Sequence, residues 1–515
     1  MRKRLTSIYG LAAAVILFPL LAQSQIPIPH QADALPVPIY IGQEFTPQNI
    51  PASTIPDHPF LASNGWSNTH NDLYMSEIYF TGGPLGAAPM EVISSNLGTE
   101  ADPIAVCITV AFDSQGRIVT TSLGRAEVRL YLIDPHTLNP LAKYDLPSRS
   151  GGGSPIAGGA YFFLDNEDRV IVPTGRQIQL ISHDDSAFHL DKRYELEHVI
   201  PEDDAIGSTL PDFAGRLWFV TKGGLVGTID RNRYPDNQSI RVTQLEGEKN
   251  DNSFAIDENG GVFIVTDHAL YRFDAGLNGE PTITWREVYD RGHQIKPGQF
   301  SMGSGTTPTL MGSRYVALTD NAEPQMHVLV YHRAKEVDGA RLVCSTPVFQ
   351  PDRSATENSL IATDRSIIVE NNYGYSNYAA TTEGQTTEPG MTRIDPDDND
   401  GCRIVWTNQE HIPSVISKMS LATGLIYTYT KDEGPENTDA WYFTAIDYIS
   451  GKTVFKQLAG TGVGYNNHYA GIYLGPDGKT AYVGVLYGIV AIRDRAESES
   501  GIPGWMELDR AHTGR

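Results

Sequence analysis

The chain is poor in cysteine, with Cys107, Cys344 and Cys402 as the three among 515 residues. Three cysteines allow one disulfide, which an exported protein would be free to form. We expect Cys344 and Cys402 to pair. The remaining Cys107 lies in an apolar strand, where a free cysteine behaves as a small buried hydrophobe.

Long apolar runs are also missing. The one candidate, Leu11 to Leu21, follows Arg-Lys-Arg and precedes Ala22-Gln-Ser24. It is shorter than the ~20 apolar residues that span a bilayer. The pattern predicts a cleaved signal peptide over residues 1–24, with a membrane anchor as the alternative. We therefore expect a secreted or periplasmic protein with no membrane insertion after cleavage.

Positive charge is in short supply: 39 Lys and Arg face 62 Asp and Glu, a formal net charge of −23. Such a surface repels nucleic acid and anionic lipid, so we expect no nucleic-acid partner. The same surface can attract cations.

Several catalytic motifs are absent. The sequence has no Gly-x-Ser-x-Gly, no His-Glu-x-x-His, no P-loop and no Gly-x-Gly-x-x-Gly after a strand. No window outside the signal shows convincing helical periodicity. Function must therefore be sought in the arrangement of strands.

What the chain has is a repeat, in which an apolar run, a polar turn and a second apolar run recur. Clear copies span residues 252–267 and 470–484, and eight units follow one another about 50 residues apart. An all-strand repeat of this length predicts a single β-propeller of eight four-stranded blades, or alternatively seven. The last unit has three strands, so we expect an N-terminal strand, near Leu73 to Phe80, to complete it.

These units set the predicted domain limits. Residues 25–65 are rich in proline and predict an extended, weakly ordered leader. The propeller should cover residues 66–494, with an insertion over 371–401 in blade six. Residues 495–515 form a polar C-terminal tail. An insertion this long is either functional or a solvated loop.

Two units resemble known propellers. The last reads Ala481-Tyr-Val-Gly484 and then Gly488-Ile-Val-Ala-Ile-Arg-Asp494, which resembles the repeat of the quinoprotein-like β-propeller superfamily. The unit over residues 252–267 is similar to the inner strands of calcium-dependent lactonase and strictosidine-synthase-like propellers. Each resemblance implies a site at the central channel and no single reaction. Quinone-dependent alcohol dehydrogenases typically carry adjacent cysteines, which this chain lacks.

Polar residues stand where several inner strands begin. In the lactonase-like propellers a Glu and several Asn or Asp at such positions bind calcium, and Glu357, Asn358 and Asn252 resemble that set by position. Calcium wants six to eight oxygens, which carboxylates and amides converging on the axis supply. The alternative is that these side chains cap turns or bond to the backbone.

Three residues are candidates for acid–base catalysis. His468 lies at the last inner strand, Glu357 could act as the acid or base itself, and His70 could be a base oriented by Asp72. For substrate binding we select Asn71 in the polar cluster around His70, with Tyr373 and Tyr375 of the insertion, whose rings could stack on sugars.

Three functions remain open. The first is an exported enzyme of hydrolase, lyase or isomerase type, acting on a small organic molecule or glycan at the channel mouth, with or without calcium. The second is a non-catalytic propeller that binds a ligand or a protein. The third is a quinone-dependent dehydrogenase, which the missing cysteine pair disfavours.

Overall fold

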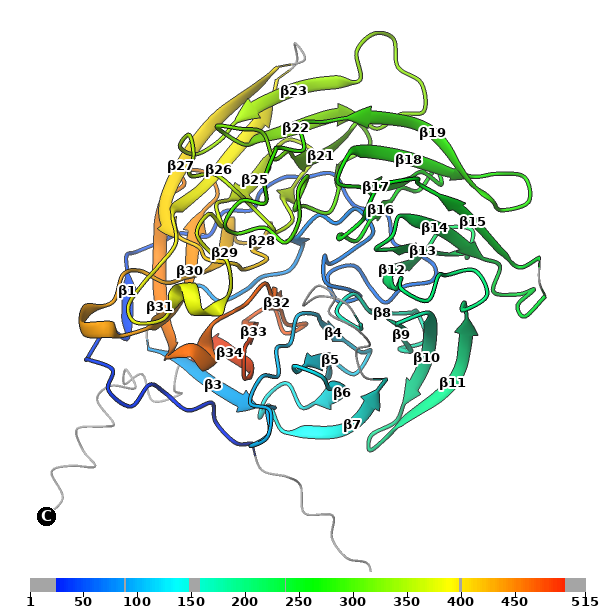
Figure 1. Cartoon of the computed structure of the whole chain (residues 1–515). Helices are drawn as coiled ribbons and strands as arrows, with labels where there is room; N and C mark the ends of the chain where they lie inside the picture. The colour runs from blue at the N-terminus through cyan, green and yellow to red at the C-terminus, as the bar shows by residue number, and fades with distance from the viewer. Residues whose placement is uncertain (1–24, 88, 148–157, 237, 398–400, 496–515) are drawn as a thin grey trace, which may run out of the picture.

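A computed structural model describes residues 25–87, 89–147, 158–236, 238–397 and 401–495. The predicted signal and nearly all of the predicted tail lie outside these ranges. Eight sheets stand in a ring around a central channel, the β-propeller that the repeat predicts (Figure 1). No helix in the described ranges is long and apolar enough to cross a membrane.

Blades one to four are formed in chain order, each from four antiparallel strands. Their strands are β4 (Val110–Phe112), β5 (Ile118–Leu123), β6 (Val128–Ile133) and β7 (Pro140–Leu146); β8 (Phe163–Leu164), β9 (Val170–Thr174), β10 (Gln177–His183) and β11 (Phe188–Glu195); β12 (Ile206–Pro211), β13 (Leu217–Thr221), β14 (Leu225–Ile229) and β15 (Ile240–Gln244); β16 (Ala255–Ile256), β17 (Val262–Val265), β18 (Ala269–Ala275) and β19 (Pro281–Val288).

Blades five to eight complete the ring. Their strands are β20 (Thr309–Met311), β21 (Tyr315–Thr319), β22 (His327–His332) and β23 (Leu342–Pro347); β24 (Ile361–Ala362), β25 (Ile367–Glu370), β26 (Pro389–Pro396) and β27 (Cys402–His411); β28 (Lys418–Ser420), β29 (Leu425–Thr430), β30 (Ala440–Asp447) and β31 (Thr453–Thr461); β32 (Ile472–Leu474), β33 (Thr480–Val485) and β34 (Gly488–Asp494). Short 3-10 helices η1 (Tyr378–Thr381), η2 (Pro435–Asn437) and η3 (Val463–Tyr465) lie in connections.

Sequence pattern explains the position of each strand in its blade. The second strand β9 is buried over its whole length, whereas outer strands such as β11 alternate buried and exposed residues with period two. The turn after an inner strand is fixed by an aspartate. Asp165 accepts the backbone N–H of Glu167 and of Arg169 at 3.0 and 2.9 Å, and the Arg169 side chain also contacts it. Asp113 and Asp212 repeat this arrangement.

An N-terminal strand closes the ring, but not the predicted one. β3 (Met90–Asn96) pairs antiparallel with β34 and supplies the fourth strand of blade eight. The segment that we expected to do this, Leu73 to Phe80, instead lies at the axis. There β2 (Ile78–Tyr79) runs parallel to β28, the inner strand of blade seven. Apolar content alone does not distinguish a strand at the outer edge from one in the channel.

Residues 62–81 therefore form a plug in the channel. Backbone groups of this plug bond to the innermost strands of several blades: Phe112 N–H donates to Trp66 O, Ile256 to Leu73 O, Leu310 to Tyr74 O, Ala362 to Ser76 O and Met419 to Glu77 O. Each of these contacts is 3.0 Å or shorter. The chain thus touches blades around the whole ring, and the channel is not an open pore over the height of the plug.

A buried ionic cluster holds the plug. Glu77 accepts from His70 Nδ1 and from Lys418 Nζ, and the side chains of Glu77 and Lys418 are fully buried. Lys418 Nζ also donates to the carbonyl of Thr69 at 2.6 Å. One carboxylate thus links two plug segments to blade seven.

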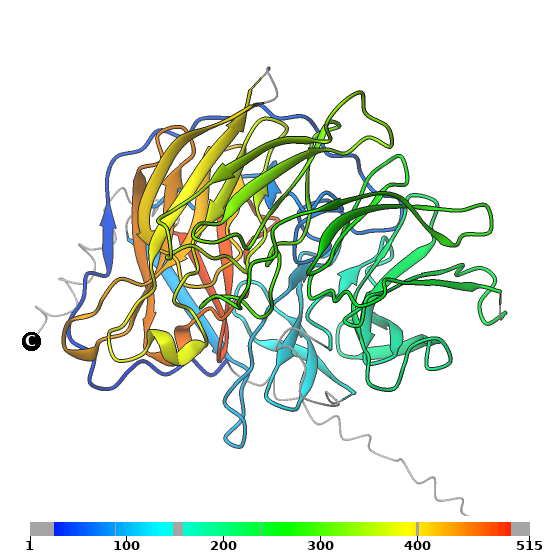
Figure 2. The ribbon, with the colours of Figure 1, turned by 45° about the horizontal axis from the view of Figure 1, so that its top comes forward.

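The leader is extended, as expected, but it is bonded to the propeller rather than weakly ordered. β1 (Tyr40–Gly42) adds a strand to the outer edge of blade seven, antiparallel to β31 (Figures 1 and 2). Ile50 N–H then donates to Leu421 O at 2.8 Å, and Ser53 Oγ to Asp364 at 2.6 Å. Proline-rich composition does not reveal these contacts, because they depend on edges that the folded blades supply.

The predicted insertion is shorter than expected. β26 lies inside residues 371–401 and is the third strand of blade six, so the connection that departs from the repeat spans residues 371–388. η1 lies in this connection, which crosses toward blade eight, where Tyr375 bonds to Asn466.

The expected disulfide between Cys344 and Cys402 is present and joins the outer strands of blades five and six. Cys107 is buried and free, as predicted, and burial raises the pKa of its thiol to about 12.

Loss of this disulfide should destabilise the fold, because it closes a loop between residues 58 apart in sequence. Replacing both cysteines with serine should lower the unfolding free energy by about 2–4 kcal/mol in denaturant titration. Reductant should lower the stability of the wild type by a similar amount and leave the double variant unchanged. An equal effect of reductant on both proteins would contradict the assignment.

The plug makes a second prediction. Lys418→Met leaves Glu77 buried without its ammonium partner, and the expected loss is about 3–5 kcal/mol of unfolding free energy. The double variant Glu77→Leu/Lys418→Met removes both charges and should regain much of that loss. A double variant as unstable as the sum of the two single variants would show that the pair is not coupled.

Candidate functional site

The innermost strands all begin at one end of the channel, which we call the mouth face. The hairpins joining first and second strands lie at the other end, the hairpin face. In blades four, six, seven and eight, the residue four positions before the first residue of the inner strand is polar. These residues are Asp251, Glu357, Ser414 and His468. The repeat thus brings these side chains to equivalent positions around the mouth.

Glu357 is the most unusual of these residues. Its Oε2 accepts the backbone N–H of Phe300 at 3.2 Å. Burial raises the pKa of its carboxyl well above the usual range, and the Asp251 carboxylate adds to that rise. Among the described residues no Lys, Arg or His forms an ion pair with Glu357. A carboxyl whose pKa is raised in this way keeps its proton to a higher pH than an exposed glutamate does, and it can donate that proton.

Space for this carboxyl comes from a glycine. Gly305 holds the equivalent position on blade five, and a Cβ there would lie 2.7 Å from Glu357 Oε2. A larger residue at position 305 would displace the carboxylate. Blade five therefore contributes room to the site where its neighbours contribute polar side chains.

Two aromatic residues lie near Glu357: Phe300, whose backbone N–H bonds to it, and Tyr469, which packs on Phe300. The Tyr469 ring lies 4.5 Å from that of Phe300, and its hydroxyl donates to the carbonyl of Tyr375 at 3.1 Å. Burial raises the pKa of Tyr469 well above its ordinary value, and the charge of Glu357 contributes. Burial also raises the pKa of Tyr161, with contributions from Glu357, Glu77 and Asp251. The Tyr161 ring stacks on that of His70 in the plug, with the two centroids 5.8 Å apart.

His468 lies at the edge of the mouth and is held by the blade-six connection. Tyr375 Oη lies 3.0 Å from His468 Nδ1 and donates to Asn466 Oδ1 at 2.7 Å. The Tyr378 ring packs edge-on at 5.8 Å. His468 and Tyr469 both have positive φ, 46° and 64°, a rare conformation for residues with side chains. Such strain is concentrated at functional sites.

The other predicted catalytic histidine is in a different place. His70 is 2% exposed, within the plug, and its partner is Glu77 rather than the predicted Asp72. Asp72 instead accepts the backbone N–H of Tyr74 at 2.8 Å. His70 Nε2 lies 3.5 Å from Thr307 Oγ1, beside a cavity of about 10 Å³, the room of a single water.

The predicted substrate-binding residues are divided in the same way. Asn71 is buried in the plug, where its Nδ2 donates to Ile78 O at 2.9 Å. Tyr375 is fully buried and supports His468. Tyr373 is half-buried in the connection, with its N–H bonded to Asn371. Of the three, Tyr373 has a side chain that remains in part accessible.

The predicted calcium ligands lie on two inner-strand starts. Asn252 Nδ2 donates to Ser304 O at 3.0 Å, and Asn358 Nδ2 donates to Glu370 Oε1 at 2.7 Å. Asn358 Oδ1 is buried without a hydrogen-bond partner among the described residues. These amide oxygens, with the carboxylates of Glu357 and Asp251, are the donor types that calcium takes. The described residues contain no group of three or more His, Cys, Asp or Glu side chains arranged to hold a metal.

Two residues near the site, Asp251 and Phe300, were not selected as site residues from the sequence. Asp251 heads the triplet Asp251-Asn-Ser253, which repeats at Glu357-Asn-Ser359, so aligning the units would have paired the two acids. Phe300, by contrast, comes from an irregular loop between blades four and five, and no repeat indicates its position.

Comparisons with known proteins add the following. No family model matches the chain. An uncharacterized protein of Archaeoglobus fulgidus is 29% identical over 342 residues, covering 60% of this chain and 64% of that protein. The chain thus spans less than two thirds of this relative's length.

Solved structures with a similar shape include BamB from Moraxella catarrhalis, at 10% identity and a TM-score of 0.38, covering 64% of this chain and 94% of that one. The WD40 domain of SCAP from fission yeast is 10% identical with a TM-score of 0.44, and the match covers 79% of this chain and 98% of that one. A functionally unknown protein from Desulfotomaculum acetoxidans is 11% identical with a TM-score of 0.37, and the match covers 65% of this chain and 95% of that one. Structural similarity at this level gives no information about activity.

Beneath the mouth, Glu370 makes stability depend on pH. Burial raises the pKa of its carboxyl from 4.5 to about 8, although bonds from Ser417 and Asn358 oppose the shift. Between these pH values the unfolded chain loses a proton that the folded chain keeps. The stability that this group contributes is complete below pH 4.5 and is lost as pH rises toward 8.

Glu370→Gln should therefore flatten this decline, by up to about 1.4 kcal/mol per pH unit. Urea titrations across the same pH range measure the slope directly. Ser366→Ala is the control, because Ser366 lies in the turn between β24 and β25 and does not titrate. This variant should keep the wild-type slope. An unchanged slope in Glu370→Gln would show that the carboxyl ionises normally.

Proposed function

We propose that the protein is an exported β-propeller enzyme that uses the mouth face for acid–base chemistry on a small organic molecule or glycan. Glu357 is the proton donor, and Asp251 is the second carboxylate. One observation carries the proposal: the Glu357 carboxyl accepts the Phe300 N–H, has no ion-pair partner among the described residues, and has a pKa that burial and the charge of Asp251 raise. Environments that separate two carboxyl pKa values are those that assign acid and base roles.

The surroundings suit a polar substrate with apolar faces. Tyr469 and Phe300 offer rings on which a sugar or a lactone could pack, while His468 offers a second titrating group. The plug closes the channel below, so substrate would enter and leave through the mouth. Hydrolase, lyase and isomerase chemistry all use such a pair of groups.

Calcium at the mouth is the alternative form of the proposal, in which Glu357 is an ionised metal ligand and not the proton donor. Two uncompensated acids and the partnerless oxygen of Asn358 fit a cation better than they fit an empty polar pocket. Glu357, Asn358 and Asn252 would hold it, with Asp251 beside them. The ion would supply positive charge that binds and polarises a substrate oxygen.

Export is proposed on two grounds. The basic and apolar residues at the start of the sequence have the pattern of a signal peptide. The Cys344–Cys402 disulfide is of a kind that persists in oxidising compartments.

Glu357→Gln tests the proposal, because it keeps the shape of the side chain and removes its proton. In assays on lactones, glycosides and uronate-containing glycans, with calcium or with chelator, we expect it to lower kcat/KM by about 100-fold or more. Glu100→Gln, an exposed glutamate in the β3–β4 loop, should leave kcat/KM unchanged. Wild-type activity should fall as pH rises, as Glu357 loses its proton.

Activity that survives in both Glu357→Gln and His468→Ala would overturn the enzymatic proposal. The second candidate, a non-catalytic scaffold that binds a ligand or protein over the mouth face, would then stand. The plug favours that candidate, since it converts the channel into a solid platform.

A further inference from the structure

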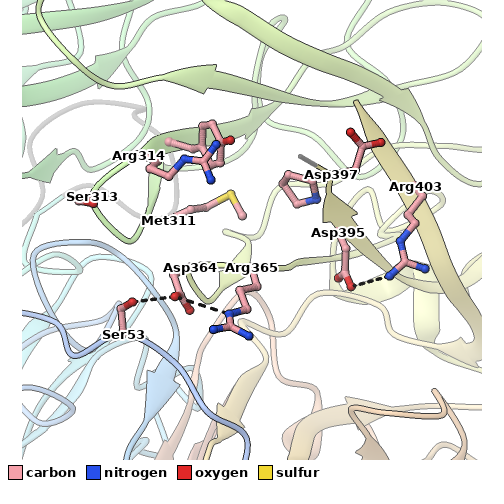
Figure 3. A pocket seen from close by; sticks show the side chains of 11 residues that line it. Ser53, Met311, Ser313, Arg314, Asp364, Arg365, Asp395, Asp397 and Arg403 are labelled. Atoms are coloured by element: carbon pink, nitrogen blue, oxygen red, sulfur yellow. Dashed lines mark hydrogen bonds and ion pairs between the residues drawn. The ribbon is translucent and has the colours of Figure 1, made fainter. Parts of the chain in front are cut away.

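The leader up to the plug, residues 25–61, is attached to the propeller near each of its ends, and a histidine lies at both attachments. His30 is at the outer edge of blade seven, and His58 is at the hairpin face of blade three. Between them the leader adds β1 to blade seven, and Ser53 Oγ donates to Asp364 Oδ2 at 2.6 Å, the contact drawn in Figure 3. The two histidines therefore mark the ends of the docked segment.

His30 is bonded in a way that requires a neutral imidazole. Its Nδ1 accepts the backbone N–H of Thr461, the last residue of β31, at 3.2 Å. Its Nε2 lies 3.3 Å from Tyr465 Oη, and because that hydroxyl donates to Ile28 O at 2.9 Å, Nε2 is the donor. The His30 ring also stacks on that of Tyr465, with centroids 4.9 Å apart. An imidazolium carries a proton on both nitrogens and cannot accept the Thr461 N–H.

His58 is bonded through the same nitrogen. Its Nδ1 accepts the backbone N–H of Phe60 at 3.2 Å, which closes a short turn of the leader. This turn presents two rings to the β12–β13 turn of blade three. The His58 ring meets Phe213 edge-on at 4.3 Å, and the Phe60 ring lies so close to Gly215 that a Cβ there would be 2.7 Å from it. Protonation of His58 would break the turn and place a charge against Phe213.

The charged groups around His58 do not compensate an imidazolium. Asp212 faces it from the β12–β13 turn, but Arg216 pairs with that carboxylate at 3.0 Å. Arg231 approaches from the other side, with its guanidinium 5.1 Å from the centroid of the Phe60 ring. Burial lowers the pKa of His58 from 6.5 to about 4, and Asp212 offsets that shift only in part.

His30 has no ion-pair partner among the described residues. Gln31, the next residue, accepts the backbone N–H of Asp439 at 2.9 Å, and the Asp439 carboxylate pairs with Lys431 at 3.3 Å. The charges on this side of blade seven are therefore already paired with each other. The docked leader thus holds both of its histidines in sites built for the neutral form.

We propose that the leader is an acid-sensitive strap, which stays docked while His30 and His58 are neutral and detaches when they are protonated. The propeller stays folded, because the closing strand β3 and the plug are held by other contacts. Detachment removes β1 from β31 and uncovers the outer edge of blade seven, an edge to which another strand can add.

The pH range follows from His58. Above pH 6.5 its imidazole is neutral whether or not the leader is docked, and docking is strongest. Between its two pKa values, 6.5 when released and about 4 when docked, the released leader takes up a proton that the docked leader excludes. Docking therefore weakens by up to about ten-fold per pH unit as pH falls through this range. Below about pH 4 the docked form is protonated too, and the loss levels off.

Hydrogen–deuterium exchange of the full chain between about pH 7 and about pH 5 tests the proposal, with rates corrected for the intrinsic effect of pH. The reporters are leader amides that donate to blade seven, those of Gln31, Gln43 and Ile50. Below pH 6.5 their protection should fall by up to about ten-fold per pH unit. Peptides from β13 and β17, buried strands of blades three and four, should keep their protection.

Asparagine variants assign the effect to the histidines. In His58→Asn the side-chain oxygen can accept the Phe60 N–H, as it does in an Asx turn, and it does not titrate. The double variant His30→Asn/His58→Asn should keep the same protection over the whole pH range. His189→Asn is the matched control, because His189 is 56% exposed on β11 and pairs with Asp184. It should lose leader protection as the wild type does.

Unchanged protection of the wild-type leader between these pH values would overturn the proposal. So would a double variant that loses protection as steeply as the wild type. An equal loss in the leader, β13 and β17 would also overturn it, because the whole fold would then respond to acid. The single variant His58→Asn should show a shallower loss than the wild type, which decides the matter if the double variant does not fold. No step of this test depends on the proposed activity at the mouth.

Discussion

The inner edge of a propeller blade carries backbone N–H and C=O groups that its own sheet cannot satisfy, and this constraint shapes the molecule. Unpaired backbone groups away from water are costly, and an open strand edge invites pairing. Here residues 62–81 bond to the inner strands around the ring, including the parallel pair of β2 and β28. The plug therefore belongs to the sheets as much as to the channel.

Pairing of the plug with β28 buries a charged side chain, because it places Glu77 at the axis. Lys418 and His70 compensate it there. A buried ion pair contributes little more stability than well-packed apolar side chains of similar volume would. Its effect here is to fix the register of the plug against the inner strands. Glu77 can pair with Lys418 and His70 in one position of the plug, which fixes how the segment winds through the ring.

A filled axis also decides where chemistry can occur. Glu357 and Asp251 stand at equivalent positions before two inner strands, at the mouth end of the channel. Burial raises the pKa of the Glu357 carboxyl, and the negative charge of Asp251 adds to that rise.

The sequence by itself predicted a propeller of eight or alternatively seven four-stranded blades, because its repeat is local, and it allowed one disulfide, for which Cys344 and Cys402 were the expected pair. It did not determine the closing strand, the partner of His70, the path of the leader or the placement of Phe300. Those depend on contacts between segments far apart in the chain, such as Glu77 with Lys418 and Met90 with Asp494. A repeat specifies what is equivalent from blade to blade, whereas the plug, the closing strand and the leader occur once, and only the assembled ring supplies the edges that select them.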